Sequence, residues 1–383
     1  MRNTILFFGA MCLQLGAFAQ QSSSFYYISD KEDFSINVNG RMQTRFSARF
    51  FEDSAATAEI SQPRMELYRS RLSFSGMLME NTFKYNFQFG FSQEGDTAWN
   101  FSKLLYDAEA TWRIRDNIHL KFGQFIMPGN LGRMVTSEYF QFVDRSVLSG
   151  AYSLDRDVGL QLNWRHYLGS FVVREKLVLT SGEGRNSEMN LGGFNYGFRL
   201  EVLPFGEFTG GEYFEADLAI DDRPKLMLGL GYNHNDNSRY SGGQKGGTLL
   251  SAERDIKTFS TDLHYKASAW SVLFEYMNVA VDIPVVYDKS AGLIVGNSFI
   301  AGDGLNAQVG YKIKGQWEVA GRFSRVAPLE VTQLGSFNEY TAALNYYIEM
   351  HRIKWQLDFS MRQADDELTK DLFVVRTQLQ LGF

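Results

Sequence analysis

The sequence predicts an all-β protein, a transmembrane antiparallel β-barrel of about sixteen strands. Three observations lead to this prediction. Apolar and polar residues alternate along most of the chain, which is the period of a strand with one face in lipid and the other in water. The 383 residues are 15% aromatic and include 35 Gly but only 6 Pro, a composition that suits many strands. The joins between alternating stretches are short and long in turn, as expected where one barrel rim carries tight turns and the other carries loops.

The first residues are excluded from the fold because they have the features of an export signal. Arg2 supplies a positive start, residues 5–18 are largely apolar, and Ala17-Phe18-Ala19 is a small-x-small cleavage site. We therefore predict a secretory signal peptide at residues 1–19, too short to span a bilayer as a helix. Cys12, the only cysteine, lies within it, so the mature chain is expected to lack disulfide and metal-thiolate chemistry. Lipid anchoring at Cys12 is the alternative.

Residues 20–33 would form an N-terminal periplasmic segment, and residues 34–383 the barrel. The alternating stretches are residues 34–50, 69–78, 83–91, 104–115, 117–126, 156–167, 170–181, 192–203, 224–234, 257–267, 269–280, 303–314, 315–326, 340–349, 352–363 and 372–383. The last is the clearest, because Phe373, Leu379 and Phe383 fall on one face while Arg376 and Gln378 fall on the other. Within a membrane its edge must be paired, so we predict that it pairs with residues 34–50 and closes the barrel.

One join departs from the pattern. Residues 204–223 are long where a short turn is expected, and we interpret them as an extension at the short-turn rim that could hold its own strand at 212–219. A soluble sandwich or propeller is the alternative to a barrel, but it would leave the aromatic strand faces unmatched.

Composition and motifs argue against several functions. A net charge of -6 and a pI near 5.5, without a nucleic-acid-binding motif, argue against nucleic acid as a partner. The five histidines show no metal-ligand spacing. The SGGQKGG sequence at 241–247 lacks the spacing of a phosphate-binding loop and is expected to be a flexible exterior segment. No catalytic, metal or cofactor site is predicted; a barrel hydrolase, with Ser and His on adjacent strands near the outer rim, is the alternative.

Residues 127–155 are the candidate constriction loop. A sixteen-stranded barrel is wide enough for an aqueous channel, so selectivity requires a segment folded into the lumen. The loop starts with the turn formers Pro128-Gly129-Asn130. It also carries apolar residues that could pack against the inner wall, namely Met134, Tyr139, Phe140, Phe142 and Val143. An extracellular lid and a trimer-contact loop are the alternatives.

Strand parity places more basic than acidic side chains in the lumen. Arg41, Arg45 and Arg49 share one face and would stand roughly 13 Å apart at about 3.4 Å per residue. The predicted anion-binding residues are Arg41, Arg45, Arg49, Arg69, Arg71, Lys121, Arg133 and Arg145. Guanidinium and ammonium groups along a narrow passage would favour small anions. The alternative is that these side chains pair with inward carboxylates and brace the wall.

Residues 121–148 read KFGQFIMPGNLGRMVTSEYFQFVDRSVL, in which Gly-x-Phe is followed by Pro and later by Phe-x-x-Arg-Ser. The matching residues are Gly123, Phe125, Pro128, Phe142, Arg145 and Ser146. With Arg-Phe-Ser at 322–324 and Asn-Tyr-Tyr at 345–347, the sequence resembles the phosphate-selective porin family (porins O and P). The terminal Phe383 resembles the C-terminal signature of bacterial outer-membrane β-barrels.

The resemblance implies a porin of the bacterial outer membrane, embedded in its lipid as a homotrimer. It would form an aqueous diffusion channel for small anions, phosphate among them. Ile126 stands where family members often have a basic residue, which weakens the expectation of phosphate specificity. A non-conducting structural or adhesive barrel is the alternative function.

Overall fold

The computed structural model describes residues 25–383, except for 30–32, 52–59, 92–103, 188–191, 221–222, 291–292, 314 and 366–370. The predicted signal peptide (residues 1–19) lies outside the described residues. None of the helices in the described ranges is long and apolar enough to span a membrane.

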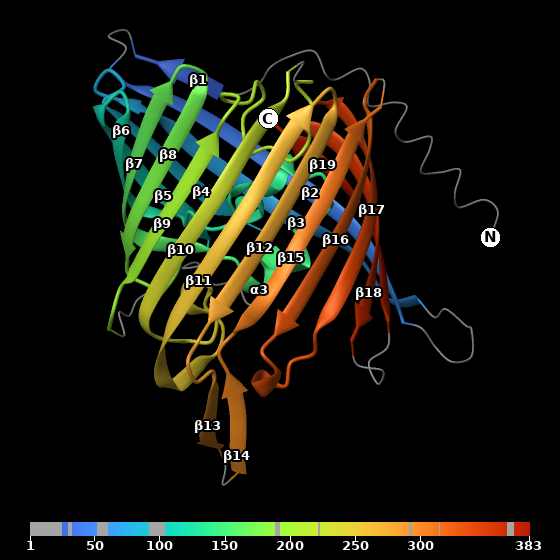
Figure 1. The fold of residues 1–383 in the computed structure, drawn as a ribbon. Coiled ribbons are helices and arrows are strands. Elements are labelled where there is room, and N and C mark those ends of the chain that lie inside the picture. Colours follow the sequence, from blue (N-terminus) through green and yellow to red (C-terminus); the bar gives the residue numbers. More distant parts are fainter. Residues whose placement is uncertain are drawn as a thin grey trace, which may run out of the picture.

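In the described residues, sixteen antiparallel strands form a closed barrel (Figure 1). They are β2 (Ser35–Phe51), β3 (Ile60–Leu78), β4 (Phe83–Gly90), β5 (Leu105–Arg115), β6 (Ile118–Ile126), β7 (Arg156–Leu168), β8 (Phe171–Thr180), β9 (Asn195–Leu203), β10 (Lys225–Tyr240), β11 (Leu249–Ala267), β12 (Trp270–Ala280), β15 (Gly302–Lys312), β16 (Trp317–Pro328), β17 (Phe337–Glu349), β18 (Ile353–Ala364) and β19 (Leu372–Gly382). Each predicted alternating stretch overlaps one of these strands, although β3, β10 and β11 are longer than predicted. The predicted barrel and its strand number are confirmed.

Alternation along each strand separates a lipid-facing surface from the lumen. In β10, Leu228, Leu230 and Tyr232 are exposed on the outer surface, whereas the residues that alternate with them are buried, namely Met227, Gly229, Gly231 and Asn233. Exposed apolar side chains on the outside of a barrel match the hydrocarbon of a bilayer. The polar inward face is therefore available to bind segments placed inside the barrel.

The last strand closes the barrel against the first, as predicted. β19 pairs with β2 from Leu372 opposite Phe51 to Gly382 opposite Arg41. Beyond that point the backbones of Phe383 and Gly40 exchange hydrogen bonds of 2.9 and 3.0 Å. A Cβ atom at Gly40 would lie 2.2 Å from the Phe383 ring, so glycine leaves the space that the terminal aromatic side chain occupies.

A short strand that was not predicted adjoins this closure. β1 (Phe25–Ile28) pairs with Ser35–Val38 of β2, where β19 has already ended, and its four side chains are exposed. Four residues are too few for alternation to distinguish a strand from a loop.

The two rims differ as expected. Short turns join β3 to β4, β5 to β6, β7 to β8, β11 to β12, β15 to β16 and β17 to β18 at one end, here called the short-turn rim. The opposite end, the long-loop rim, carries the hairpin of β13 (Val285–Ser290) and β14 (Leu293–Ser298), which projects below the barrel in Figure 1. It also carries the short helices η4 (Gly243–Lys245) and η5 (Glu330–Thr332).

The interpretation of residues 204–223 as an extension with a strand at 212–219 is wrong. Residues 205–219, here called the inner segment, form turns and bends without a strand. Phe208, Ala216 and Leu218 are buried, and so are the carboxylates of Glu215 and Asp217. The segment folds into the lumen because these side chains find both apolar and hydrogen-bonding partners there.

Gly123 explains why the Gly-x-Phe pattern starts with glycine. Its φ is +111°, and a Cβ atom at this position would lie 2.2 Å from the carbonyl oxygen of Ala108 on β5. Two residues later, Phe125 is fully buried with Met127 and Val178. The glycine thus allows β5 and β6 to pair closely just before the chain turns inward.

We expect Gly123→Ala to lower the free energy of unfolding by roughly 1–3 kcal/mol, the typical cost of a strained backbone conformation. Urea unfolding of the barrel in lipid vesicles, followed by tryptophan fluorescence, would measure the change. Gly321→Ala on β16 is the control, because a Cβ atom there meets nothing within 4 Å. Equal unfolding midpoints for the two variants would contradict the prediction.

Candidate functional site

The inserted loop (residues 127–155) leaves β6, crosses the barrel interior and returns to β7. It contains α2 (Leu131–Met134), η3 (Ser137–Tyr139) and α3 (Val147–Tyr152). Its backbone carbonyl groups accept hydrogen bonds from inward side chains of distant strands. These bonds run from Arg199 to Gly129 (2.7 Å), Lys354 to Phe140 (2.7 Å), Asn345 to Gln141 (2.7 Å) and Arg322 to Asp144 (2.9 Å). The donors belong to β9, β18, β17 and β16, so the loop lies inside the barrel.

Apolar packing holds one side of the loop against the wall. Leu131, Val135 and Phe140 are buried in a cluster with the wall residues Val172, Leu203, Met227 and Leu273. Phe142 is buried beside Ala320 and Ala343 of β16 and β17. Removal of this apolar surface from water favours the inserted position of the loop.

Asp144 attaches the loop to the opposite wall. Its carboxylate accepts hydrogen bonds from Arg69 Nη2 at 2.7 Å, Arg45 Nη1 at 3.1 Å and the Tyr68 hydroxyl at 3.2 Å. The Arg45 guanidinium also lies 3.3 Å from the centre of the Tyr68 ring. Because charge-assisted hydrogen bonds are about twice as strong as neutral ones, this cluster is a strong attachment to β2 and β3.

The charge state of Asp144 follows from these contacts. Burial alone would raise the pKa of its carboxyl group, but the positive charges of Arg69, Arg45 and Arg376 hold that pKa well below its usual range. Such a group contributes stability above its unfolded-state pKa of about 3.9, and the contribution is lost only as the pH falls through the lower folded-state value. The attachment should therefore be unchanged between neutral and mildly acidic pH.

Two more of the predicted arginines bind the loop. Arg41 Nη2 donates to Ser137 Oγ at 3.0 Å, and its Nη1 donates to Glu138 Oε2 at 3.3 Å. Arg145, within the loop, donates to the carbonyl oxygen of Val135 at 3.0 Å. With Arg45 and Arg69, these side chains make the bracing contacts that the sequence left open as an alternative to anion binding.

The other predicted residues lie in different surroundings. Arg133 forms an ion pair with Asp155 inside the loop. Lys121 on β6 pairs with Glu109 on β5 at 2.7 Å. Arg49 is exposed near the long-loop rim. The structure thus brings Arg41, Arg45 and Arg69 together at the inserted loop, and it leaves Arg49 apart from them.

Tyr106 is the centre of an arginine cluster. The guanidinium carbons of Arg71 and Arg185 each lie 4.2 Å from the centre of its ring, and that of Arg156 lies at 5.1 Å. Arg156 also donates two hydrogen bonds to Asp107, of 2.7 and 3.1 Å. Of the three arginines, sequence reasoning identified only Arg71.

Strand parity misplaces Tyr106 because the ladder is interrupted there. Gln88 pairs with Asp107, but the next residue, Phe89, pairs with Leu105, so Tyr106 is an extra residue in a β-bulge. A bulge redirects the side chain of the extra residue. Arg185 lies in a loop, where alternation carries no information about direction.

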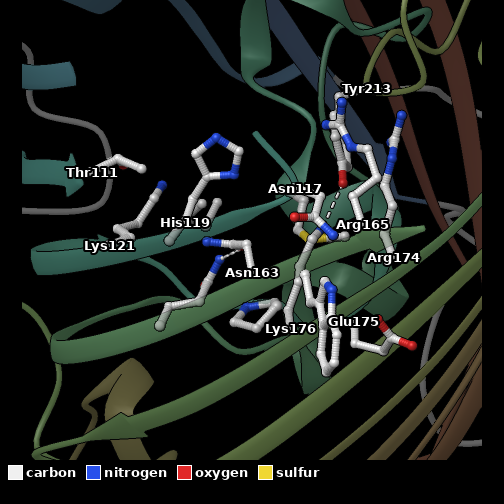
Figure 2. Close-up of a pocket in the computed structure, with 15 residues that line it drawn as sticks. Thr111, Asn117, His119, Lys121, Asn163, Arg165, Arg174, Glu175, Lys176 and Tyr213 are labelled. Atoms are coloured by element: carbon white, nitrogen blue, oxygen red, sulfur yellow. Dashed lines mark hydrogen bonds between the residues drawn. The ribbon is translucent and has the colours of Figure 1, made fainter. Parts of the chain in front are cut away.

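Two cavities lie beside the inserted loop, along the wall of β2–β8. The larger is about 640 Å³ and the smaller about 380 Å³. Both are lined by Ile126 and Met134, so they adjoin. In the smaller cavity, Lys121 and His119 lie across from Arg165 and Arg174 (Figure 2).

Basic side chains outnumber carboxylates in the lining of these cavities. The basic ones are Arg41, Arg71, Arg156 and Arg352 in the larger cavity and Lys121, Arg165, Arg174 and Lys176 in the smaller one. The carboxylates are Asp107, Glu109 and Glu138 in the larger cavity and Glu175 in the smaller one.

The sequence matches the model of the family "phosphate-selective porin O and P" over residues 36–383. The chain belongs to this family. It is an outer-membrane porin by family and by fold. None of the curated proteins matches the sequence.

Three solved structures share the fold of this porin. The anion-selective porin of Comamonas acidovorans is 11% identical, with a TM-score of 0.57, and the match covers 91% of this chain and 100% of that one. The outer membrane channel DcaP of Acinetobacter baumannii is 12% identical, with a TM-score of 0.56, covering 93% and 99%. Salmonella typhi OmpF is 11% identical, with a TM-score of 0.57, covering 93% and 100%.

Residues 241–247 of this porin are not the flexible exterior segment expected from the sequence. Ser241 and Gln244 are buried, and the Lys245 ammonium group donates hydrogen bonds to the carbonyl oxygens of Gly150 and Ala151 in α3. Burial, together with the nearby positive charge of Arg133, lowers the pKa of Lys245 to about 8. The inserted loop is therefore also bound from the long-loop rim.

The outer surface of this porin carries a side-chain group that sequence spacing did not reveal. His234, Asp236 and Asp255 each offer an atom that lies within 4.8 Å of the other two. The first two belong to β10 and the third to β11, and a register shift in the pairing of these strands lies beside them. Their types suit a metal ion, but the contact of 3.7 Å between His234 and Asp255 is also an ordinary ion pair.

We expect Asp144→Asn to loosen the inserted loop while the barrel stays folded, because the substitution removes the charge that Arg45 and Arg69 bind. Single-channel recordings should show increased current noise and more substates than the unmodified porin shows. The matched control is Asp365→Asn, which removes the partner of Arg325 from an ion pair of 2.8 Å exposed at the long-loop rim. Identical recordings from both variants would show that Asp144 does not fix the loop.

Proposed function

We propose that this porin forms an aqueous channel whose open path runs along the β2–β8 side of the lumen. The larger cavity carries this proposal, because it reaches from Asn37 and Phe383 near the short-turn rim to Asp107 and Arg156 beside the inserted loop. A polar path beside an in-folded loop is how a wide barrel is restricted to small solutes. Short turns and both termini of such barrels face the periplasm, so the long-loop rim would face the exterior.

We infer a modest preference for small anions from the charges along this path. Basic side chains outnumber carboxylates there, and a charged passage concentrates counter-ions. Part of the positive charge is neutralised, because Lys121 pairs with Glu109 and Arg156 with Asp107. Ile126 lines both cavities at a position where the family often has a basic residue, which supports a preference for anions in general over one specific to phosphate.

A non-conducting structural barrel remains the second candidate, and one observation favours it. On the opposite side of the lumen, Arg199, Glu275 and Lys354 are completely buried beneath the inserted segments. If the inserted segments covered the whole cross-section of the lumen in this way, no ionic current would flow through the barrel. Planar bilayer recording of the folded porin distinguishes the two functions, since a protein that never conducts would favour the structural barrel.

We expect Lys121→Gln combined with Arg165→Gln to reduce the anion-to-cation permeability ratio by roughly twofold, because both side chains line the smaller cavity. Zero-current potentials under a salt gradient would measure the ratio. Lys257→Gln, at an exposed position on the outer face of β11, should leave it unchanged. A cation preference in the unmodified porin, or a ratio unaffected by the double substitution, would contradict the proposed selectivity.

We also propose that three copies of this porin assemble in the outer membrane, an expectation that rests on the family. Cross-linking in native membranes should give a band at three times the monomer mass that persists in mild detergent. A monodisperse monomer under both conditions would count against the trimer.

A further inference from the structure

The inner segment (residues 205–219) enters the lumen from the short-turn rim, opposite to the rim from which the inserted loop enters. It joins β9 to β10, where a short turn would suffice to connect the strands. The segment is therefore longer than the connection between the two strands requires.

The inner segment binds the inserted loop directly. The carboxylate of Glu215 accepts a hydrogen bond of 2.8 Å from the backbone N–H of Gln141, and the N–H of Glu215 donates to the carbonyl oxygen of Tyr139 at 3.3 Å. The ring of Phe214 lies 4.0 Å from the ring of Tyr139, measured between centres. These contacts support the loop from the side of the short-turn rim, at the stretch between η3 and Phe142.

The inner segment is also fixed to the barrel wall. The backbone N–H of Ala269 donates to Asp217 at 3.0 Å, and Arg174 Nη2 donates to Glu212 at 3.2 Å. The hydroxyl group of Tyr213 accepts a hydrogen bond of 2.6 Å from the ammonium group of Lys176. Buried hydrogen bonds to charged groups cost free energy to break, so the segment is held as a fixed part of the lumen.

The inner segment adds negative charge beside the smaller cavity. Glu207 accepts a hydrogen bond of 2.5 Å from Arg174 and lies 3.5 Å from Arg165. Both arginines line that cavity. Glu207 and Glu212 thus neutralise positive charge that would otherwise face the passage.

We propose that the inner segment is a second selectivity element of the channel. It contacts β8 and the turn between β11 and β12, it fixes the inserted loop from the periplasmic direction, and its carboxylates reduce the anion preference of the passage. This inference rests on the proposed channel function. The inserted loop and the inner segment, one from each rim, would together set the dimensions of the pore.

The main test replaces residues 206–219 with Asn-Gly in the full-length porin, refolded into planar bilayers. The single-channel conductance should rise by about twofold or more, because the conducting section widens. The control shortens the β13–β14 hairpin at the long-loop rim by replacing residues 287–296 with Asn-Gly, which keeps Val286, a residue buried with Leu148 and Tyr152 of the inserted loop. This control should conduct like the unmodified porin. Equal conductance of all three proteins would overturn the proposal while leaving the channel function intact.

A second variant tests the charge effect without deleting the segment and serves if the deletion fails to fold. Glu207→Gln with Glu212→Gln keeps side-chain volume but removes both carboxylates. The anion-to-cation permeability ratio should rise by roughly twofold, with little change in conductance. An unchanged ratio would overturn the charge assignment.

Two further results separate this inference from the proposed function. If the deletion variant conducts and the unmodified porin does not, the inner segment is the barrier. That result would overturn the proposal that the unmodified porin is an open channel. Absence of conduction in both, with correctly folded barrels, would overturn the channel and this inference together.

Discussion

The requirement that backbone N–H and C=O groups be paired inside a bilayer determines the rest of this structure. Lipid offers no hydrogen-bonding partner, so a sheet that crosses it must close on itself. The pairing of β19 with β2 completes that closure, and sixteen strands make the enclosed space wide. A wide lumen can then select among small solutes only if folded segments narrow it. The inserted loop and the inner segment narrow the lumen, and their contacts with the wall hold them in place.

Polar chemistry dominates the interior because the lumen wall must be polar if water is to pass. A segment placed inside can therefore be held by ion pairs and hydrogen bonds as well as by apolar contacts. The arginines divide accordingly into two groups. Arg45 and Arg69 bind Asp144 of the loop, whereas Arg165 and Lys121 line a cavity. Residue type alone does not distinguish these roles; the position of the partner does.

Local patterns made most of the fold predictable from sequence. Alternation has a period of two residues and is read within one strand, so all sixteen barrel strands and their closure followed from it. The contents of the lumen depend on contacts between distant residues. Parity correctly placed Arg41 and Arg45 inside, but it could not show that Glu138 and Asp144 would bind them. Residues 212–219 were wrongly interpreted as a strand because their conformation depends on contacts with the lumen, and Tyr106 was missed because it sits in a bulge that reverses parity.

The closure between β2 and β19 also constrains the order of events during biogenesis. The hydrogen bonds between Gly40 and Phe383 join a residue of the first barrel strand to the residue that follows β19. β19 is synthesised after the other strands of the barrel, so the barrel can be completed only after β19 has left the ribosome. Until then β2 has an unpaired edge of alternating apolar residues, which is prone to aggregation. The topology therefore requires that this edge of β2 be kept from pairing with other chains until β19 is available.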